Sequence, residues 1–311
     1  MNDSMRPRAP ANIRNAFTID VEDYYQVEGF AHVVDKSTWE RYPSRVERNT
    51  DAILELLARH DTRGTFFVLG WVAERHPELV RRIAAAGHEV ASHGYSHTMV
   101  YKQLPSVFRL ETRRSKALLE DIVQRPVTGY RAATYSITPR SLWALDILCE
   151  EGFQYDSSIF PIRHDRYGMT DGPRFPYTVR ARNGMEIIEF PISTVNIARY
   201  QLPIGGGGYF RLLPYAVSAA GLARVNRERE PFIFYLHPWE IDPEQPHIAG
   251  GAMANFRHRV NLRSCMHKLD RLLSDFAFTT AAEVLAGYEH RDLVPFTHTA
   301  EDEEETGAAP V

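Results

Sequence analysis

Three acidic residues stand together near the N-terminus, at the point where a short apolar stretch ends. The segment AFTIDVEDYY (residues 16–25) leads from apolar residues into Asp20, Glu22 and Asp23. Carboxylates at the end of a buried strand repel one another and lose hydration, so they need a compensating positive group. The sequence therefore raises the question of which cation these three acids serve.

Two histidines four residues apart are the second feature that could do chemistry. His93 and His97 lie in SHGYSHTMVY, directly after the strand-like segment 88–92. This spacing can place two imidazoles about one turn apart, close enough to share one ion. With a carboxylate from the first strand end they would form a two-histidine, one-carboxylate site with open positions, which is typical of catalytic zinc. Such a metal polarises a carbonyl group and lowers the pKa of its bound water.

Three further polar residues, Arg131, Asp156 and His237, close or follow other strand-like segments. Hydrolysis needs a base for the attacking water and an acid for the leaving group. A second acid at the first strand end can act as the base, and His237 as the acid. Arg131 would hold the base ionised, because an adjacent cation favours the carboxylate, and Asp156 could orient His237 and keep it protonated. Taken singly, Arg131 and Asp156 could equally form ordinary surface ion pairs.

The elements that must position these residues alternate between strand-like and helix-like patterns. Apolar strand candidates cover residues 16–20, 64–70, 88–92, 127–131, 186–191, 232–237 and 276–280. Amphipathic helical patterns cover residues 44–60, 76–87, 105–123 and 139–152. This alternation predicts an α/β barrel or a doubly wound sheet, and both place active sites at the carboxyl ends of strands. Residues 160–215 break the rhythm, and a hairpin is predicted there with its turn at Asn183-Gly184.

Composition is that of an ordinary globular protein. The 311 residues are 44% hydrophobic and 24% charged, and a formal net charge of -4 without a dense basic stripe argues against a nucleic-acid partner. Cys149 and Cys265 are too few for a disulfide framework. The N-terminus lacks the apolar core of a signal peptide, and no run approaches the length of a membrane span. We therefore expect a cytoplasmic protein with no integral membrane segment.

Five motifs, in order along the chain, resemble those of a known family. They are TIDVED (18–23), SHGYSH (92–97), GYRAATYS (129–136), FQYDSSIF (153–160) and FYLHPWE (234–240). Together they resemble the polysaccharide deacetylases of carbohydrate esterase family 4, the NodB-homology fold. The resemblance implies a distorted (β/α) barrel of about seven units, consistent with the strand pattern. It also implies removal of N-acetyl groups from aminosugar polymers with a divalent metal, usually Zn²⁺, although Co²⁺ or Fe²⁺ would also suit such ligands.

The resemblance further implies how the acids divide the work. In the family, the first acid of an adjacent Asp pair is the base and the second holds the metal. Asp20 aligns with the first and is assigned as the base. Glu22 and Asp23 then compete for the metal beside His93 and His97, because here the pair is not adjacent. We prefer Asp23, whose shorter side chain loses less rotamer freedom on binding, and keep Glu22 as the alternative ligand.

The remaining roles follow from the same resemblance. His237 is the expected acid, Asp156 the residue that orients it, and Arg131 the residue that orients the base. The family's usual Arg-Pro-Pro-Tyr is Arg-Ala-Ala-Thr in this chain. The backbone N–H group that stabilises the tetrahedral oxyanion is therefore expected from Thr134 or Tyr135.

Sequence variants narrow the resemblance to one subgroup. DVEDYYQV and YLHPWEIDPEQP resemble deacetylases linked to bacterial exopolysaccharide (PEP-CTERM-associated) loci, which carry their own C-terminal extension, here about 241–290. We expect a flexible N-terminus (1–15), a barrel over 16–290 and an acidic disordered tail (291–311). The implied substrate is an N-acetylated polysaccharide or oligosaccharide, and association with the exopolysaccharide synthesis machinery is expected.

Two other functions fit part of this pattern. An allantoinase-like hydrolase of a small amide or ureide would keep the metal site, although the C-terminal segment disfavours it. A non-catalytic sugar-binding scaffold would belong to a different class of protein. Retention of the full set of acids, histidines and arginine argues against it, because a scaffold has no need of them.

Overall fold

The computed structural model describes residues 13–164, 167–170, 172–182, 184–197, 200–289 and 292–295. Most of the expected flexible N-terminus and acidic tail lies outside these residues, as does Asn183 of the predicted turn. Within the described part, no helix is long and apolar enough to span a bilayer. Cys149 and Cys265 are both buried and free, in agreement with the absence of a disulfide framework.

A mostly parallel sheet forms the centre of the molecule. Its strands lie in the spatial order β10-β1-β2-β3-β4-β5-β7-β6-β12, with β11 beside β1. From β10 to β7 all neighbours are parallel, whereas β6 and β7 form an antiparallel hairpin. The strands are β1 Asn15–Val21, β2 Thr65–Val68, β3 Glu89–Ser92, β4 Gly129–Tyr130, β5 Tyr155–Asp156, β6 Tyr177–Arg180, β7 Glu186–Glu189, β10 Ile233–Leu236, β11 Phe278–Thr279 and β12 Leu293–Pro295; β8 Thr194–Ile197 and β9 Tyr200–Pro203 form a separate hairpin. The seven parallel strands confirm the predicted α/β class.

The barrel is distorted because β10 and β7 do not pair with each other. The chain between them crosses the gap and bonds to both sides. The N–H of Ile192 donates to Ile159 O at 3.1 Å, and Ile233 N–H donates to Ser193 Oγ at 2.8 Å. The N–H of Tyr235 donates to Gly205 O at 2.7 Å. These bonds satisfy backbone groups that a further strand would otherwise pair.

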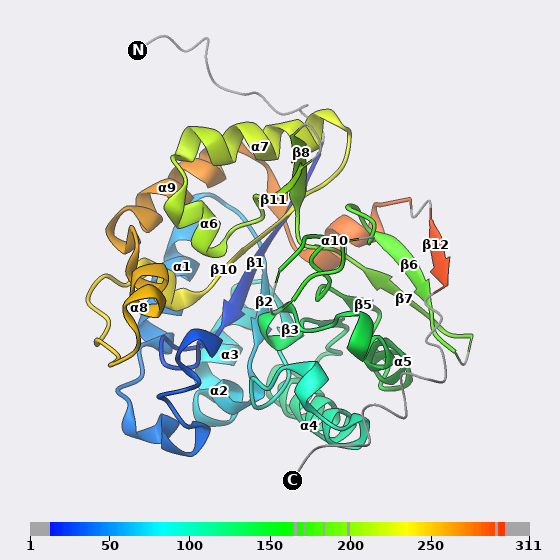
Figure 1. Cartoon of the computed structure of the whole chain (residues 1–311), viewed down its shortest axis with the longest axis horizontal. Helices are drawn as coiled ribbons and strands as arrows, with labels where there is room; N and C mark the ends of the chain where they lie inside the picture. Colours follow the sequence, from blue (N-terminus) through cyan, green and yellow to red (C-terminus); the bar gives the residue numbers. More distant parts are fainter. Residues whose placement is uncertain are drawn as a thin grey trace.

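Helices surround the strands, as Figure 1 shows. They are α1 Val46–Arg59, α2 Gly70–Arg75, α3 Pro77–Ala85, α4 Pro105–Val123, α5 Trp143–Glu150, α6 Gly207–Leu212, α7 Tyr215–Arg227, α8 Ala252–Arg259, α9 Leu262–Asp275 and α10 Ala281–Ala286. The four predicted helices correspond to α1, α3, α4 and α5. Pro77 and Pro105 each open their helix, where a missing N–H is tolerated.

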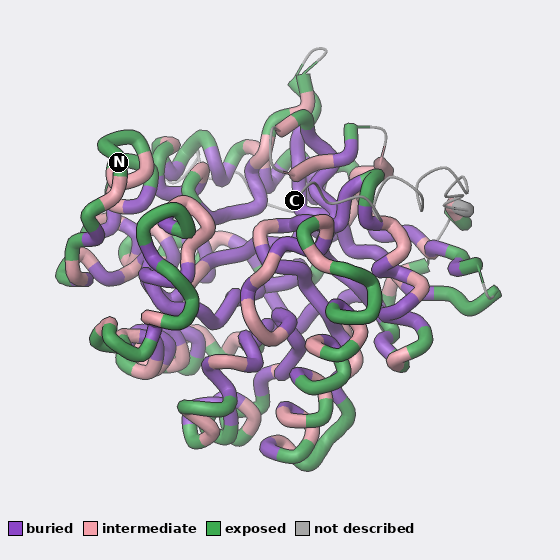
Figure 2. Tube along the Cα trace, turned by 60° about the horizontal axis from the view of Figure 1, so that its bottom comes forward, coloured by how far each residue is buried: buried purple, intermediate pink, exposed green. Residues whose placement is uncertain are grey.

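The apolar runs fold as strands because the sheet is covered on both faces. Every residue of β1 is buried, and Figure 2 shows buried chain throughout the centre with exposed segments at the rim. Phe17 of β1 stacks on Phe234 of β10 with ring centroids 5.6 Å apart and meets Phe278 of β11 edge-on at 5.4 Å. Burial of each such ring stabilises the fold by roughly 2–3 kcal/mol. This packing fixes the ends of these strands, and it therefore also fixes the backbone of the polar residues that directly follow them.

Gly206, just before α6, is a backbone position that only glycine can fill. It lies against β10 with φ +133°, and a Cβ atom there would lie 1.9 Å from Tyr235 O. Gly206→Ala should therefore lower stability by about 3 kcal/mol or more, through both overlap and strain. Gly208→Ala is the matched control, because its Cβ would meet no atom closer than 3.8 Å. Thermal midpoints from circular dichroism measure the difference, and equal midpoints would show that this contact is not needed.

Candidate active site

The first strand end carries a buried ion pair. Arg131 Nη1 donates to Asp20 Oδ1 at 2.6 Å and to Thr18 Oγ1 at 2.8 Å. Its Nε and Nη2 donate to the carbonyl and hydroxyl oxygens of Ser157 at 3.1 and 3.0 Å. The guanidinium group also lies 4.1 Å from the centre of the Phe67 ring. Arg131 is thus fixed from several directions, and the structure brings together the two residues that the sequence pairs.

Glu22, His93 and His97 form a buried cluster beside this pair. One potential ligand atom from each residue lies within 4.8 Å of the other two. Glu22 Oε2 is 2.7 Å from His97 Nε2. His93 Nδ1–H donates to the carbonyl oxygen of Arg131 at 2.9 Å, which leaves Nε2 as its ligand atom. The loop that follows β3 turns through His97 with φ +52° and so folds the second imidazole back toward the first.

The charges in this cluster suit a divalent cation. Burial lowers the pKa of His93 to about 4, so its imidazole is neutral and free to bind. Burial alone would raise the pKa of Glu22, but the nearby His97 and His237 hold it well below its usual range. Glu22 Oε2 is buried and lies 2.7 Å from His97 Nε2. A carboxylate with a lowered pKa beside two imidazoles is the donor set of a metal site.

Asp23 lies outside this cluster, so the preference for Asp23 as the carboxylate ligand is not supported by the geometry. Its Oδ2 accepts hydrogen bonds from Ser44 Oγ, Arg45 N–H and Val46 N–H at 2.8, 2.8 and 3.1 Å. The carboxylate thereby caps the start of α1, whose first N–H groups have no partner within the helix. Side chains alternate along an extended chain, so Glu22 points with Asp20 toward the site and Asp23 points away. Glu22, the alternative, holds the place beside the histidines.

His237 follows β10, the strand that pairs directly with β1, and so faces both acids from the neighbouring strand end. Its Nε2 is 3.9 Å from Asp20 Oδ2 and 3.6 Å from Glu22 Oε1, and its Nδ1 is 3.2 Å from Glu240 Oε2. Burial would lower the pKa of His237, but these three carboxylates outweigh it and raise the value to about 9. The imidazole is therefore protonated at neutral pH. The indole of Trp239 stacks on it at 5.2 Å and donates to Glu22 Oε1 at 3.3 Å.

Asp156 does not orient His237; Glu240 takes that position. Asp156 instead pairs with Glu189 at the end of β7, and its Oδ1 accepts from Ser158 Oγ at 2.5 Å. Burial raises the pKa of Asp156 to about 6 and that of Glu189 well above its usual range, so the pair retains a proton. Sequence reasoning missed both glutamates. Glu189 lies within the predicted strand 186–191 and ends the observed β7, and Glu240 lies three residues after His237, so each carried a usable signal.

The turn expected to supply the oxyanion donor is present after β4. Thr134 and Tyr135 both adopt positive φ angles, +57° and +53°, which are uncommon for these residue types. The N–H of Tyr135 already donates to Ala132 O at 3.1 Å. Of the two expected donors, Tyr135 is therefore engaged in closing its own turn.

Comparison with protein families divides the chain into two parts. Residues 34–148 match the family model of polysaccharide deacetylases, and residues 157–286 match a domain of unknown function, DUF3473. The chain is thus similar to polysaccharide deacetylases in its first part and to DUF3473 in its second. Of the candidate site residues, His93, His97 and Arg131 fall in the deacetylase match, whereas His237, Glu189 and Glu240 fall in DUF3473. Asp20 and Glu22 precede both matches.

A relative named as a deacetylase is similar to part of this chain. The chain is 35% identical over 111 residues to a chitooligosaccharide deacetylase of Rhizobium leguminosarum bv. trifolii, covering 29% of this chain and 52% of that protein. The chain thus spans about half the length of this relative.

Solved structures share the fold at low sequence identity. A crystal structure of a Mycobacterium smegmatis protein, provisionally assigned as a polysaccharide deacetylase, has a TM-score of 0.62 and 20% identity; the match covers 94% of this chain and 98% of that one. The Puue allantoinase has a TM-score of 0.57 and 16% identity, with 90% and 92% covered. This chain therefore shares its fold with both of these proteins.

The different positions of Glu22 and Asp23 give a direct test. Glu22→Gln should reduce binding of a divalent cation to well below one equivalent, because it removes the anionic donor of the cluster. Asp23→Asn should retain the cation but lower stability by roughly 1–3 kcal/mol, because a capping carboxylate with several donors is lost. Elemental analysis and thermal unfolding of both variants provide the measurements.

The control for the cap is Asp35→Asn, since Asp35 is exposed and accepts only from Ser37. Its effect on stability should be smaller. Loss of metal in Asp23→Asn with full retention in Glu22→Gln would exchange the two roles.

The Asp156–Glu189 pair predicts a pH effect on stability. A carboxyl group whose folded pKa is raised above its unfolded value of about 4.5 adds stability at low pH and loses it as the pH rises. Gln at position 189 cannot ionise, so the thermal midpoint of Glu189→Gln should rise relative to wild type between pH 5 and pH 8. For Glu186→Gln, at the exposed start of the same strand, the difference in thermal midpoint from wild type should be the same at every pH. A constant difference for Glu189→Gln as well would mean that the buried pair holds no proton.

Proposed function

We propose that this protein is a metal-dependent hydrolase that removes N-acetyl groups from an aminosugar-containing bacterial polysaccharide or its precursor. One observation carries the proposal. The buried Glu22–His93–His97 cluster, the carboxylate of Asp20 and the protonated imidazole of His237 lie together, with His237 Nε2 3.6 Å from Glu22 Oε1 and 3.9 Å from Asp20 Oδ2. Amide hydrolysis requires such a set, because a base must take a proton from the attacking water and an acid must give one to the departing amine.

Glu22, His93 and His97 would hold the cation, with Zn²⁺ as the first choice and Co²⁺ or Fe²⁺ as alternatives. A divalent cation bound there would polarise the acetyl carbonyl group and make a nearby water more acidic. The three protein donors leave positions open for substrate and water, as in catalytic sites. His93 is fixed for this purpose by the carbonyl of Arg131, and Glu22 by the indole of Trp239.

The chain's own residues carry the proton transfers. Asp20, paired with the Arg131 guanidinium, accepts a proton from the attacking water. His237 donates its Nε2 proton to the departing amine, while Glu240 holds the proton on Nδ1. An amine is a poor leaving group, so its protonation is a demanding step of the reaction. The backbone N–H of Thr134 is the remaining candidate for the oxyanion, since that of Tyr135 is used within its turn.

The substrate class rests on the relatives. The Rhizobium protein is named as a chitooligosaccharide deacetylase, which supports an N-acetylated sugar for this chain. The exopolysaccharide pathway rests on the motif resemblance alone. The DUF3473 match runs over residues 157–286 and so includes most of the expected C-terminal extension at about 241–290. The fold alone favours no substrate, because an allantoinase shares it. A ureide substrate lacks comparable sequence support.

Acetate release provides the test of this proposal. The purified protein should release acetate from N-acetylated glucosamine oligosaccharides, and prior removal of metal with a chelator should abolish this activity. Added Zn²⁺ should restore it. His237→Ala should lower kcat by about a hundredfold or more with bound metal unchanged, the usual scale for loss of a general acid. Hydrolysis of allantoin without acetate release from any sugar would replace the proposal with the ureide function.

A further inference from the structure

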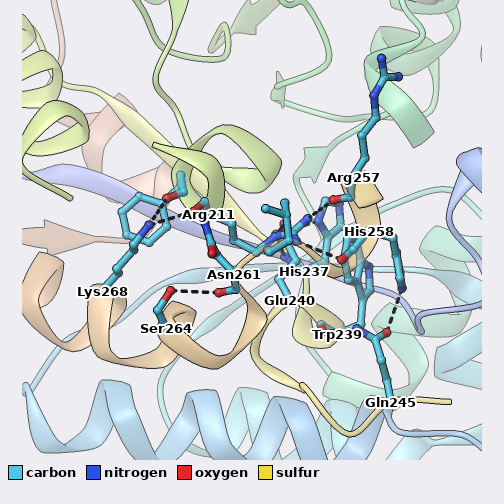
Figure 3. Close-up of polar contacts among 12 residues, drawn as sticks. Arg211, His237, Trp239, Glu240, Gln245, Arg257, His258, Asn261, Ser264 and Lys268 are labelled. Atoms are coloured by element: carbon cyan, nitrogen blue, oxygen red, sulfur yellow. Dashed lines mark hydrogen bonds and ion pairs between the residues drawn. The ribbon is translucent and has the colours of Figure 1, made fainter. Parts of the chain in front are cut away.

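His237 is held by a carboxylate that is itself held from behind. Glu240 is fully buried, and its Oε2 accepts hydrogen bonds from both the Nδ1 and the backbone N–H of His237, at 3.2 and 3.1 Å. Its other oxygen, Oε1, accepts from Arg211 Nε at 2.7 Å. Figure 3 shows Arg211, Glu240 and His237 grouped together with the residues that contact Arg211. Both oxygens of Glu240 are therefore occupied, and its plane is fixed by one partner on each side.

Arg211 is anchored by backbone carbonyl groups from a different part of the chain. Its Nη1 donates to His258 O and Val260 O at 3.0 and 2.8 Å, and its Nη2 donates to Arg257 O at 3.0 Å. These carbonyls lie at and just beyond the C-terminal end of α8, where the helix has unpaired oxygens and partial negative charge. The fork of a guanidinium group reaches several acceptors at once, whereas a lysine ammonium could not reproduce that geometry.

The same segment supports the site at a second point. The ring of His258 stacks on Trp239 at 4.2 Å, and its Nε2–H donates to Gln245 Oε1 at 2.9 Å. Trp239 in turn stacks on His237 and donates to Glu22. The end of α8 therefore contacts the supports of both His237 and Glu22. A segment that served only to cover the barrel would not need contacts with both Arg211 and Trp239.

The C-terminal end of α6, which carries Arg211, is clamped separately. Lys268 of α9 donates to the carbonyl oxygens of Phe210, Arg211 and Leu213 at 3.1, 2.9 and 2.8 Å. Lys268 forms no hydrogen bond with Glu240 or His237 among the described contacts. Lys268 therefore holds the same turn of chain as Arg211 but does not contact Glu240 or His237. This makes it a matched control for Arg211.

We propose that Arg211 is a positioning residue for His237, acting through Glu240, and that the end of α8 within DUF3473 supplies the carbonyl groups that fix it. The proposal rests on the proposed deacetylase function. It assigns a task to part of a domain of unknown function: the segment 257–260 completes the support of the general acid. Asp156, which the sequence predicts for this task, is directed elsewhere, and the Glu240–Arg211 pair takes its place.

Leaving-group dependence separates positioning of an acid from a general structural effect. The amine released from an N-acetyl sugar needs the proton of His237 in order to leave. The 4-nitrophenolate released from 4-nitrophenyl acetate is a stabilised anion and leaves without that proton. Arg211→Met should lower kcat on N-acetylglucosamine oligosaccharides by about a hundredfold with KM nearly unchanged, yet lower ester hydrolysis by less than about threefold. Arg211→Lys should behave similarly with a smaller loss, and it guards against a Met variant that fails to fold. Lys268→Met should either leave both rates unchanged or lower both by the same factor.

A crystal structure of Arg211→Lys adds a readout that does not depend on activity. The His237 ring should turn away from Glu240, with Nδ1 no longer within hydrogen-bond distance, while Glu22, His93 and His97 keep their places. If the wild-type protein releases acetate but the Arg211 variants lose amide and ester hydrolysis in parallel, or keep the His237–Glu240 contact, the inference is wrong. If the wild-type protein releases no acetate from any sugar, the proposed function fails, and the position of the His237 ring still decides the inference.

Discussion

Buried carboxylates at one end of the barrel are the constraint on which the rest of the site depends. Asp20, Glu22 and Glu240 all face His237, and each is almost wholly removed from water. An unpaired buried carboxylate would cost several kcal/mol, so each needs its own positive or donor partner. Asp20 has Arg131, and Glu240 has Arg211. Glu22 has only imidazoles and an indole N–H, which is why the proposed cation completes the balance of charge at this point.

The strand pattern was readable from the sequence because the barrel imposes it locally. Parallel strands covered on both faces appear as short apolar runs, and their polar termini meet at one edge. Arg131, His93 and His237 could therefore be placed near Asp20 without a structure. The geometry does not support the choice of Asp23 over Glu22, for an instructive reason. Rotamer entropy differs little between the two acids, whereas the alternation of side chains decides which one can reach the site at all.

The partner of Glu240 was beyond local patterns, whereas the partner of Asp156 was not. Asp156 pairs with Glu189, 33 residues later, because β5 and β7 are parallel neighbours with these two residues in register. Arg211 reaches Glu240 from α6, a helix that follows an irregular stretch, and no repeated spacing signals this pairing. The short strand β5 and the helices α6 to α10 were not predicted, although the buried residues of α9, among them Leu262, Cys265, Leu269 and Leu272, follow a helical spacing. A cytoplasmic location and an exopolysaccharide substrate stay predictions of the sequence.

The two family matches do not correspond to two separate tasks. Residues 34–148 contain His93, His97 and Arg131, whereas β10, His237, Glu240 and Arg211 belong to residues 157–286. Asp20 and Glu22 lie in and directly after β1, which precedes both matches. Because β1 pairs with β10 along four residues in register, main-chain hydrogen bonds fix Asp20 and His237 relative to each other. The DUF3473 match therefore contributes one wall of the candidate site, and in the proposed arrangement its carbonyl contacts to Arg211 extend that wall to the orientation of the His237 imidazole.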